Sequence, residues 1–325
     1  MQIKRIRWGM IGCGEVTEVK SGPAFQKAKR SELVAVMRRN AAKAADYARR
    51  HDIPRWYDDA EALIRDPAVD AVYIATPPVF HKQYVLQIAR AGKPIYVEKP
   101  MAMNYAECLE MIAACADAGV PLFVAYYRRA LPRFLKIREL LSENAIGTVR
   151  AVNTVFYRPP LDIDLTGGPH WRVDPQIGGA GYFYDLACHN IDILQFLLGD
   201  IVAASGFASN QQKLYPAADA FSGAYLFESG VQGTCIWNFS SYSNLDHTEI
   251  IGAQGKIVFS TFGEEAIVLE NSGGRLEFNF INPAHIQQPL IQIIVDELTG
   301  RGKCPSTGQT GARTNWVMDR ILNQP

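Results

Sequence analysis

Five short apolar runs alternate with helical segments over residues 5–125, and this alternation limits the possible folds more than any other feature of the chain. Strands that are apolar along their whole length are buried on both faces of a sheet. The segments between them suit helices, since several are alanine-rich and two end at Gly92 and Gly119. The alternation predicts an α/β protein with a doubly wound parallel sheet. The expected strands are Ile6–Ile11, Leu33–Met37, Ala71–Ala75, Pro94–Val97 and Pro121–Val124, and the expected helices Ala41–Arg50, Asp58–Arg65, His81–Ala91 and Asn104–Ala118.

The hydrophobic pattern changes after Val124. A helix over 132–141 and a strand over 148–157 are followed by a long helix, 182–198, and then by short strands between 202 and 280 that are separated by glycine turns. Runs of strands without helices between them favour an open, mainly antiparallel sheet. We therefore expect a first domain over 1–125 and a second α/β domain over 126–306. The final helix, about 307–323, is expected to pack back on the first domain.

Composition excludes several classes of protein. The 325 residues include 33 Lys and Arg against 33 Asp and Glu, so no net charge draws the chain to nucleic acid or to an anionic membrane. No apolar stretch approaches the roughly 18 residues that span a bilayer. Six cysteines are scattered without a Cys-x-x-Cys pair, which disfavours a disulfide framework and a zinc site. We expect a cytoplasmic protein without nucleic-acid or membrane partners.

A glycine turn follows the first strand directly. Gly12 and Gly14 allow a sharp strand-to-helix turn whose backbone N–H groups can approach a pyrophosphate. Thr17 stands where this fingerprint has a small residue, so we expect a looser contact of the first helix there. The second strand ends in Arg38 and Arg39 instead of the acidic residue that holds a free ribose 2′-hydroxyl. Two guanidiniums suit a 2′-phosphate, so the expected cofactor is NADP, with NAD as the alternative. A solvated arginine pair at a helix start is the simpler reading.

A second group of residues has the composition of a proton-transfer site. Lys99 follows the fourth strand, at the sheet edge where open α/β sheets bind ligands. Asp185, His189 and Asp192 are spaced by four and three, which places them on one helical face. An imidazole can take a hydroxyl proton, and a carboxylate can orient the ring. An ordinary polar helix face and a carboxylate–histidine metal site are the alternatives, and we expect no metal.

The chain resembles the Gfo/Idh/MocA oxidoreductase family over essentially its whole length. The resemblance rests on the glycine turn and on several further motifs: Thr76-Pro77 with His81, Ala91-Gly92-Lys93-Pro94, Glu98-Lys99-Pro100, Trp171-Arg172, and Gly178–Gly181 leading to Asp185 and His189. It implies a Rossmann domain followed by a domain whose open sheet forms a homodimer or homotetramer. It also implies an acid/base role for His189, a place for Lys99 near the reacting hydroxyl, and Asp185 as a partner of substrate or histidine.

The resemblance further implies an NAD(P)-dependent enzyme that interconverts a secondary hydroxyl and a ketone on a sugar or cyclic polyol. Activity on dihydrodiols and a non-catalytic nucleotide sensor are the alternatives. Ala187 and Cys188 before His189, and Tyr126 and Tyr127, depart from the common pattern, which leaves the substrate open. The expected cofactor-binding residues are Gly12, Cys13, Gly14, Glu15, Val16, Arg38, Arg39, Thr76, Pro77, His81, Glu98 and Lys99. The expected substrate-binding residues are Tyr126, Tyr127, Arg128, Tyr157, Trp171, Arg172, Asp185 and His189, although the aromatic ones could equally be packing residues.

Overall fold

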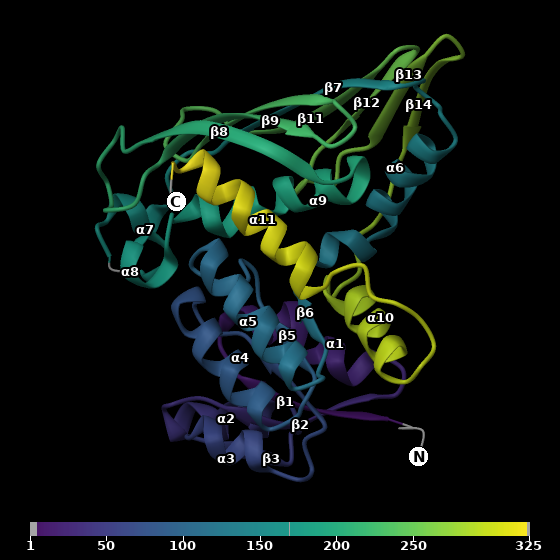
Figure 1. The fold of residues 1–325 in the computed structure, drawn as a ribbon. Coiled ribbons are helices and arrows are strands. Elements are labelled where there is room, and N and C mark those ends of the chain that lie inside the picture. The colour runs from purple at the N-terminus through teal and green to yellow at the C-terminus, as the bar shows by residue number, and fades with distance from the viewer. Residues whose placement is uncertain (1–4, 169, 324–325) are drawn as a thin grey trace. The chain divides into compact units, whose positions relative to one another are not determined.

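A computed structural model describes residues 5–168 and 170–323 (Figure 1). The chain divides into two compact units, each made of two segments. The first unit is Met1–Leu131 with Pro283–Ala312, and the second is Pro132–Asn282 with Arg313–Pro325. The domain limits expected from the sequence, 1–125 and 126–306, stay a prediction.

The first unit contains a six-stranded parallel sheet in the order β3-β2-β1-β4-β5-β6. Its strands are β1 (Ile6–Ile11), β2 (Ser31–Met37), β3 (Arg55–Tyr57), β4 (Ala71–Ile74), β5 (Ile95–Val97) and β6 (Leu122–Val124). The doubly wound parallel sheet predicted from the sequence is confirmed. The strand β3 was not expected, because Arg55 and Trp56 are exposed and no apolar run marks this edge of the sheet.

Short side chains define the starts of the helices in this unit. Asn40, Asp59 and Asn104 accept hydrogen bonds from backbone N–H groups in the first turns of α2 (Ala41–Arg50), α3 (Ala60–Arg65) and α5 (Tyr105–Asp117). The cap of α3 is therefore Asp59, and the helix begins at Ala60 and not at Asp58 as expected. The helices are η1 (Thr17–Ser21), α1 (Gly22–Lys27), α2 (Ala41–Arg50), α3 (Ala60–Arg65), η2 (Pro78–Phe80), α4 (His81–Arg90), α5 (Tyr105–Asp117) and η3 (Tyr127–Ala130).

A late segment of the chain completes the first unit. Helix α10 (Gln288–Leu298) packs against α1, and Thr307 forms a β-bridge with Phe123 of β6. On one face of the sheet, the ring of Phe25 packs between those of Trp8 and Tyr73, with centroid distances of 5.0 Å to Trp8 and 5.2 Å to Tyr73. Buried aromatic side chains of this size contribute much of a core's stability.

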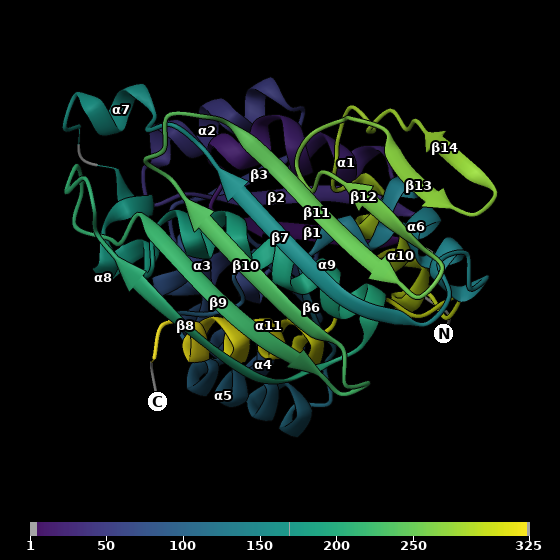
Figure 2. The same cartoon turned by 90° about the horizontal axis from the view of Figure 1, so that it is seen from above.

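The second unit contains an eight-stranded sheet in the order β14-β13-β12-β11-β7-β10-β9-β8, in which only the β7–β10 pair is parallel. Helices α6 (Pro132–Ser142) and α9 (Cys188–Leu198) lie against one face of the sheet, and no described element covers the other face (Figures 1 and 2). The predicted open, mainly antiparallel sheet is confirmed. Its strands are β7 (Val149–Tyr157), β8 (Ile201–Ser209), β9 (Ala220–Phe227), β10 (Gln232–Asn238), β11 (Leu245–Gly252), β12 (Gly255–Phe259), β13 (Ile267–Asn271) and β14 (Gly274–Phe278).

The long helix expected over 182–198 consists of two parts. A π-helical turn, η5 (Phe183–Ala187), leads directly into α9 (Cys188–Leu198). The other helices of this unit are α6 (Pro132–Ser142), α7 (Asp162–Leu165), η4 (Trp171–Val173) and α8 (Pro175–Gly178), and the division between the units falls inside α11 (Gly308–Ile321). No helix in the described ranges is long and apolar enough to cross a membrane.

Candidate functional site

The glycine turn after β1 has the geometry that a phosphate site needs. Gly12 has φ +95°, and a Cβ there would lie 2.8 Å from the carbonyl oxygen of Ala75. At Gly14 the nearest atom to an added Cβ is 3.9 Å away, so the space beside this residue is open. Glycine is therefore required at position 12 by its conformation and by the close backbone of Ala75, just after β4. The turn fits the pyrophosphate of a dinucleotide, with Cys13 buried, Glu15 exposed and Val16 half-buried.

Thr17 is accommodated in the turn instead of being displaced from it. Its side chain is buried, and its hydroxyl donates to the carbonyl oxygen of Gly14 at 2.7 Å. The close approach occurs five residues later, where a Cβ on Gly22 would overlap the Thr17 carbonyl and the Tyr47 hydroxyl. That hydroxyl donates to the Thr17 carbonyl oxygen at 2.8 Å. Burial raises the pKa of the nearby Cys13 thiol to about 11, so this cysteine is a neutral packing group.

The two arginines after β2 point to different neighbours. Nη1 of Arg38 donates to the carbonyl oxygen of Cys13 at 3.2 Å, which ties this side chain to the glycine turn. The guanidinium of the exposed Arg39 lies 5.1 Å from the ring centroid of Phe80. Arg39 is therefore held by a contact that leaves its N–H groups available to a ligand.

His81 holds two loops at the carboxyl edge of the sheet together. Its Nε2 lies 2.8 Å from the carbonyl oxygen of Thr76, and its Nδ1 lies 3.1 Å from that of Pro100. The ring is fully buried, and this burial lowers its pKa while the backbone carbonyls oppose the shift. His81 can therefore position the Thr76-Pro77 loop, whereas a direct contact with a cofactor would need one of these bonds to break.

Glu98 is the centre of a buried hydrogen-bond network beneath Lys99. Its Oε1 accepts hydrogen bonds from the Tyr73 hydroxyl and from the Gln287 amide, each at 2.6 Å. Its Oε2 accepts from the backbone N–H of Lys99 at 3.1 Å. The bond between Lys99 and Pro100 is cis. The network fixes the backbone that presents the lysine at the end of β5.

The aromatic and basic residues after β6 are more buried than the lining of an open pocket would be. Tyr126, Tyr127 and Arg128 are all buried in the first unit. The guanidinium of Arg128 lies 4.9 Å from the ring centroid of Tyr127. Among the residues predicted to bind substrate, these three and His189 are buried, and the other four are partly exposed.

Tyr157 occupies the outward face of the sheet in the second unit. Along β7, Val152, Thr154 and Phe156 are buried, and Tyr157 falls on the alternate side. The following residue, Arg158, stacks its guanidinium 4.2 Å from the ring centroid of Tyr182.

Three further predicted residues form a connected group in the second unit. The guanidinium of Arg172 lies 4.8 Å from the ring centroid of Trp171, and its Nε lies 3.5 Å from Oδ2 of Asp185. Asp185 belongs to the π-helical turn η5, whose wider spacing rotates it relative to the α-helical face assumed from the sequence. Such turns are frequent at functional sites.

His189 is held in the first turn of α9 by well-packed neighbours. Its ring is buried and meets the ring of Phe262 edge-on at 5.9 Å. The next residue, Asn190, accepts a 3.0 Å hydrogen bond from the indole of Trp237 and donates one of 2.8 Å to Thr261. These buried bonds fix the rotation of the helix and hence the direction of the imidazole.

Comparisons with known proteins give the family. The model "Oxidoreductase family, NAD-binding Rossmann fold" matches residues 6–126, and "GFO/IDH/MocA C-terminal domain" matches residues 134–258. Oxidoreductase P35 of Formosa agariphila is 39% identical over 97% of this chain and 98% of its own length. The chain belongs to the Gfo/Idh/MocA oxidoreductase family. As a member, it is an oxidoreductase with an NAD-binding Rossmann fold.

Three other known proteins are similar over most of their length. The 1,5-anhydro-D-fructose reductase of Ensifer adhaerens is 28% identical over 94% of this chain and 92% of its own. The D-xylose 1-dehydrogenase [NADP(+)] of Haloarcula marismortui is 27% identical, with coverages of 85% and 79%. A levoglucosan dehydrogenase in complex with NADH and levoglucosan superimposes with a TM-score of 0.88 at 21% identity, covering 98% of this chain and 96% of that one. This last match shows the fold.

In each unit, some residues that hold the predicted site residues in place were not themselves predicted. Gln287 lies 189 positions from its partner Glu98, and no local pattern marks it. Phe262, beside His189, lies in a loop between strands. Asn190 offered the clearest signal, because a polar residue in a mainly apolar helix usually has a buried partner.

Proposed function

We propose that this protein is an NADP-dependent oxidoreductase that interconverts a secondary hydroxyl and a ketone on a sugar or cyclic polyol. The observation that carries the proposal is the fixed backbone of Lys99 at the carboxyl end of β5, where the buried Glu98 accepts its N–H. In doubly wound sheets ligands bind at this edge. The Ensifer and Haloarcula relatives are both named for activities on sugars, which supports the substrate class.

NADP is proposed as the cofactor because its 2′-phosphate needs cations where the second strand ends. Arg38 and Arg39 supply two guanidiniums there, and a bidentate contact with phosphate is the strongest that either could make. The open side of Gly14 leaves room for the pyrophosphate. The NADP(+) named for the xylose dehydrogenase agrees with this choice, whereas the levoglucosan dehydrogenase complex contains NADH.

The proposed chemistry divides the work between three side chains. When bound, the nicotinamide cofactor supplies the centre that accepts or donates hydride. The imidazole of His189 takes the hydroxyl proton during oxidation and returns it during reduction. The ammonium of Lys99 donates a hydrogen bond to the reacting oxygen and stabilises its developing negative charge. Asp185, fixed by Arg172, orients the substrate or the imidazole.

Absorbance of the reduced nicotinamide tests this assignment. NADP is supplied with a panel of sugars, inositols and dihydrodiols, and turnover is expected on at least one sugar or polyol. His189→Ala and Lys99→Ala should each lower kcat by about 10²-fold or more, with NADP affinity near that of the parent. His247→Ala is the control, since that histidine lies on β11 outside the predicted site. Full turnover in both variants would reject the roles, and silence across the panel with NADP bound would favour a nucleotide sensor.

We also propose that the open sheet pairs with a second copy of the chain. One row across its uncovered face contains Phe207, Ser222, Ile236 and Val155 in successive strands. Phe207 is 79% exposed and Ile236 is 43% exposed. Apolar side chains gathered on one face favour association, because their burial removes apolar surface from water.

A further inference from the structure

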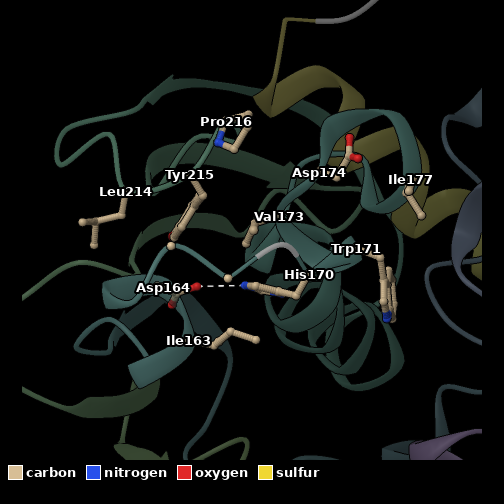
Figure 3. A pocket seen from close by; sticks show the side chains of 12 residues that line it. Ile163, Asp164, His170, Trp171, Val173, Asp174, Ile177, Leu214, Tyr215 and Pro216 are labelled. Carbon is tan, nitrogen blue, oxygen red and sulfur yellow. Dashed lines mark hydrogen bonds and ion pairs between the residues drawn. The ribbon is translucent and has the colours of Figure 1, made fainter.

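The second unit contains a pocket that none of the expected catalytic residues lines. It lies between α7, η4, α8 and the loop at 214–216, and its volume is about 340 Å³ (Figure 3). This volume is at the small end of the range for ligand sites and suits a single ring. Lys99, Asp185 and His189 are absent from its walls.

The walls of the pocket combine apolar and aromatic side chains. Trp171 and Tyr215 supply the rings, and most of the remaining side chains are aliphatic. Aromatic faces carry negative potential and attract the weakly positive C–H groups of a saturated ring. The aliphatic and proline side chains in the wall are Ile163, Val173, Ile177, Leu214 and Pro216.

A buried carboxylate orients the histidine in the wall. Asp164 has no exposed side-chain surface, and its Oδ1 lies 2.9 Å from Nε2 of His170 (Figure 3). The same carboxylate accepts hydrogen bonds from the Tyr182 hydroxyl and from the backbone N–H of Leu161, both at 2.8 Å. With these partners the proton of a neutral His170 is held on Nε2. Its Nδ1 is then an acceptor, and within residues 5–168 and 170–323 it has no hydrogen-bond partner.

Two more polar groups in the wall can form further hydrogen bonds. The hydroxyl of Tyr215 has no hydrogen-bond partner in the described part of the chain, although the residue is only 8% exposed. Oδ1 of Asp174 accepts from the backbone N–H of Gln176 at 2.9 Å, and no bond to its other oxygen is found among the described residues. A buried hydroxyl without a partner is costly, so a ligand that satisfies it gains affinity.

We propose that this pocket binds a neutral, polyhydroxylated ring, that is, one sugar or cyclitol unit. Hydroxyl groups can donate to Nδ1 of His170 and to the Asp174 carboxylate, and the ring's C–H face can pack on an aromatic wall. Two carboxylates against one imidazole disfavour phosphates and sugar acids. The occupant would contact Trp171, whose indole supports Arg172 and, through it, Asp185.

Histidine NMR separates this pocket from the expected catalytic site. The chain has six histidines, so protein labelled at histidine Cε1 gives a small set of signals in which His170 reports the pocket and His189 the catalytic group. The probes are D-glucose, D-xylose, myo-inositol and D-glucuronate. We expect saturable shifts of the His170 signal with at least one neutral probe, and at least about tenfold weaker binding of D-glucuronate, the cost of one uncompensated charge contact.

A pair of neighbouring variants locates the ligand. Ile177→Trp places a large side chain in the pocket and should abolish the His170 response to the sugar. Gln176→Trp adds the same side chain to the exposed neighbour on α8, outside the pocket, and should preserve it. The proposal is overturned by a His170 signal that stays unchanged across the panel, by an Ile177→Trp protein that responds like the parent, or by D-glucuronate binding as tightly as glucose. A response of His189 alone would overturn it and leave the proposed oxidoreductase function intact.

Discussion

The side-chain amide of Gln287 donates a 2.6 Å hydrogen bond to Oε1 of Glu98, which precedes it by 189 positions. Both residues are buried in the first unit, and the Tyr96 hydroxyl donates to the other end of the same amide at 2.8 Å. The returning segment 283–312 thus supplies a donor to the carboxylate that accepts the N–H of Lys99. The lysine loop depends on two distant parts of the chain.

Gln287→Ala should destabilise the protein because it leaves a buried carboxylate short of one donor. The expected loss is about 1–3 kcal/mol of unfolding free energy. Urea unfolding followed by circular dichroism measures it. Gln288→Ala is the matched control, because Gln288 is the adjacent residue and its side chain forms no hydrogen bond within the described ranges. Equal effects of the two variants would show that the bond to Glu98 contributes nothing.

Arg38 and Arg39, after β2, should differ in how strongly each favours NADPH over NADH. The guanidinium of Arg39 lies over the Phe80 ring and forms no hydrogen bond or ion pair within the described ranges. Arg39→Ala should therefore weaken NADPH binding by about 10- to 100-fold, the value of a charged hydrogen bond. NADH binding should change by less than about threefold, because NADH lacks the 2′-phosphate. Arg38→Ala should weaken both, since Arg38 also supports the glycine turn through Cys13.

Fluorescence titration of reduced cofactor at fixed salt measures both affinities. Lys43→Ala removes an exposed positive charge from the first turns of α2 and controls for the general field of the helix. A parent protein that binds NADH as tightly as NADPH would contradict the cofactor proposal. So would an Arg39→Ala protein in which both affinities fall equally.

The pattern of apolar residues was enough to predict the parallel sheet but not its edge strand β3. Buried strands are recognisable because both faces are apolar, whereas β3 is a three-residue edge with Arg55 and Trp56 exposed. In the site, Trp171, Arg172 and Asp185 were predicted individually, and the structure connects them. The π-helical turn at Asp185 cannot be predicted from residue spacing, because the helix type depends on which carbonyl oxygen accepts each backbone N–H in the packed structure.

Stability should depend on pH through Glu18, next to the glycine turn. Arg50 binds both of its carboxylate oxygens, at 2.7 and 2.8 Å, and this pairing together with His51 lowers the pKa of Glu18 from 4.5 to about 2. A lowered pKa in the folded state stabilises the protein above the unfolded value and stops doing so as pH falls through the folded value. Glu18→Gln should therefore reduce stability most above pH 4.5.

Urea midpoints of parent and Glu18→Gln protein at several pH values between 7 and 3 test this. The difference between them should be constant at the upper end and shrink below about pH 4.5. A difference that does not vary with pH would mean that the ion pair is not its cause. Glu61→Gln, which removes an exposed glutamate paired with Arg65 on α3, controls for loss of a surface charge.

Assembly should depend on the uncovered face of the eight-stranded sheet. Ile236→Glu places a charge in the middle of the apolar row and should convert the oligomer to monomer at micromolar concentration, because the charge would have to be buried without a partner. Sedimentation velocity measures the change. Leu135→Glu on α6 is the control, since Leu135 has the same 43% exposure but lies away from this face. A monomeric parent, or an Ile236→Glu protein that sediments like the parent, would reject the interface.

Arg172 should act on the reaction through Asp185 and not independently. The two side chains are 27% and 29% exposed with Nε and Oδ2 3.5 Å apart, so each partly shields the other from water. Arg172→Ala and Asp185→Asn should each lower kcat/KM by about tenfold or more, and the double variant should be little worse than either, because residues in one contact are not additive. NADPH affinity should stay unchanged in all three. Arg138→Ala, which removes an exposed guanidinium stacked 4.8 Å from Phe196, controls for the loss of a similar contact elsewhere in the second unit. If the loss of kcat/KM in the double variant equals the product of the two single losses, Arg172 acts on the substrate independently of Asp185. Only an interaction shared by the two residues leaves the second substitution with little further effect.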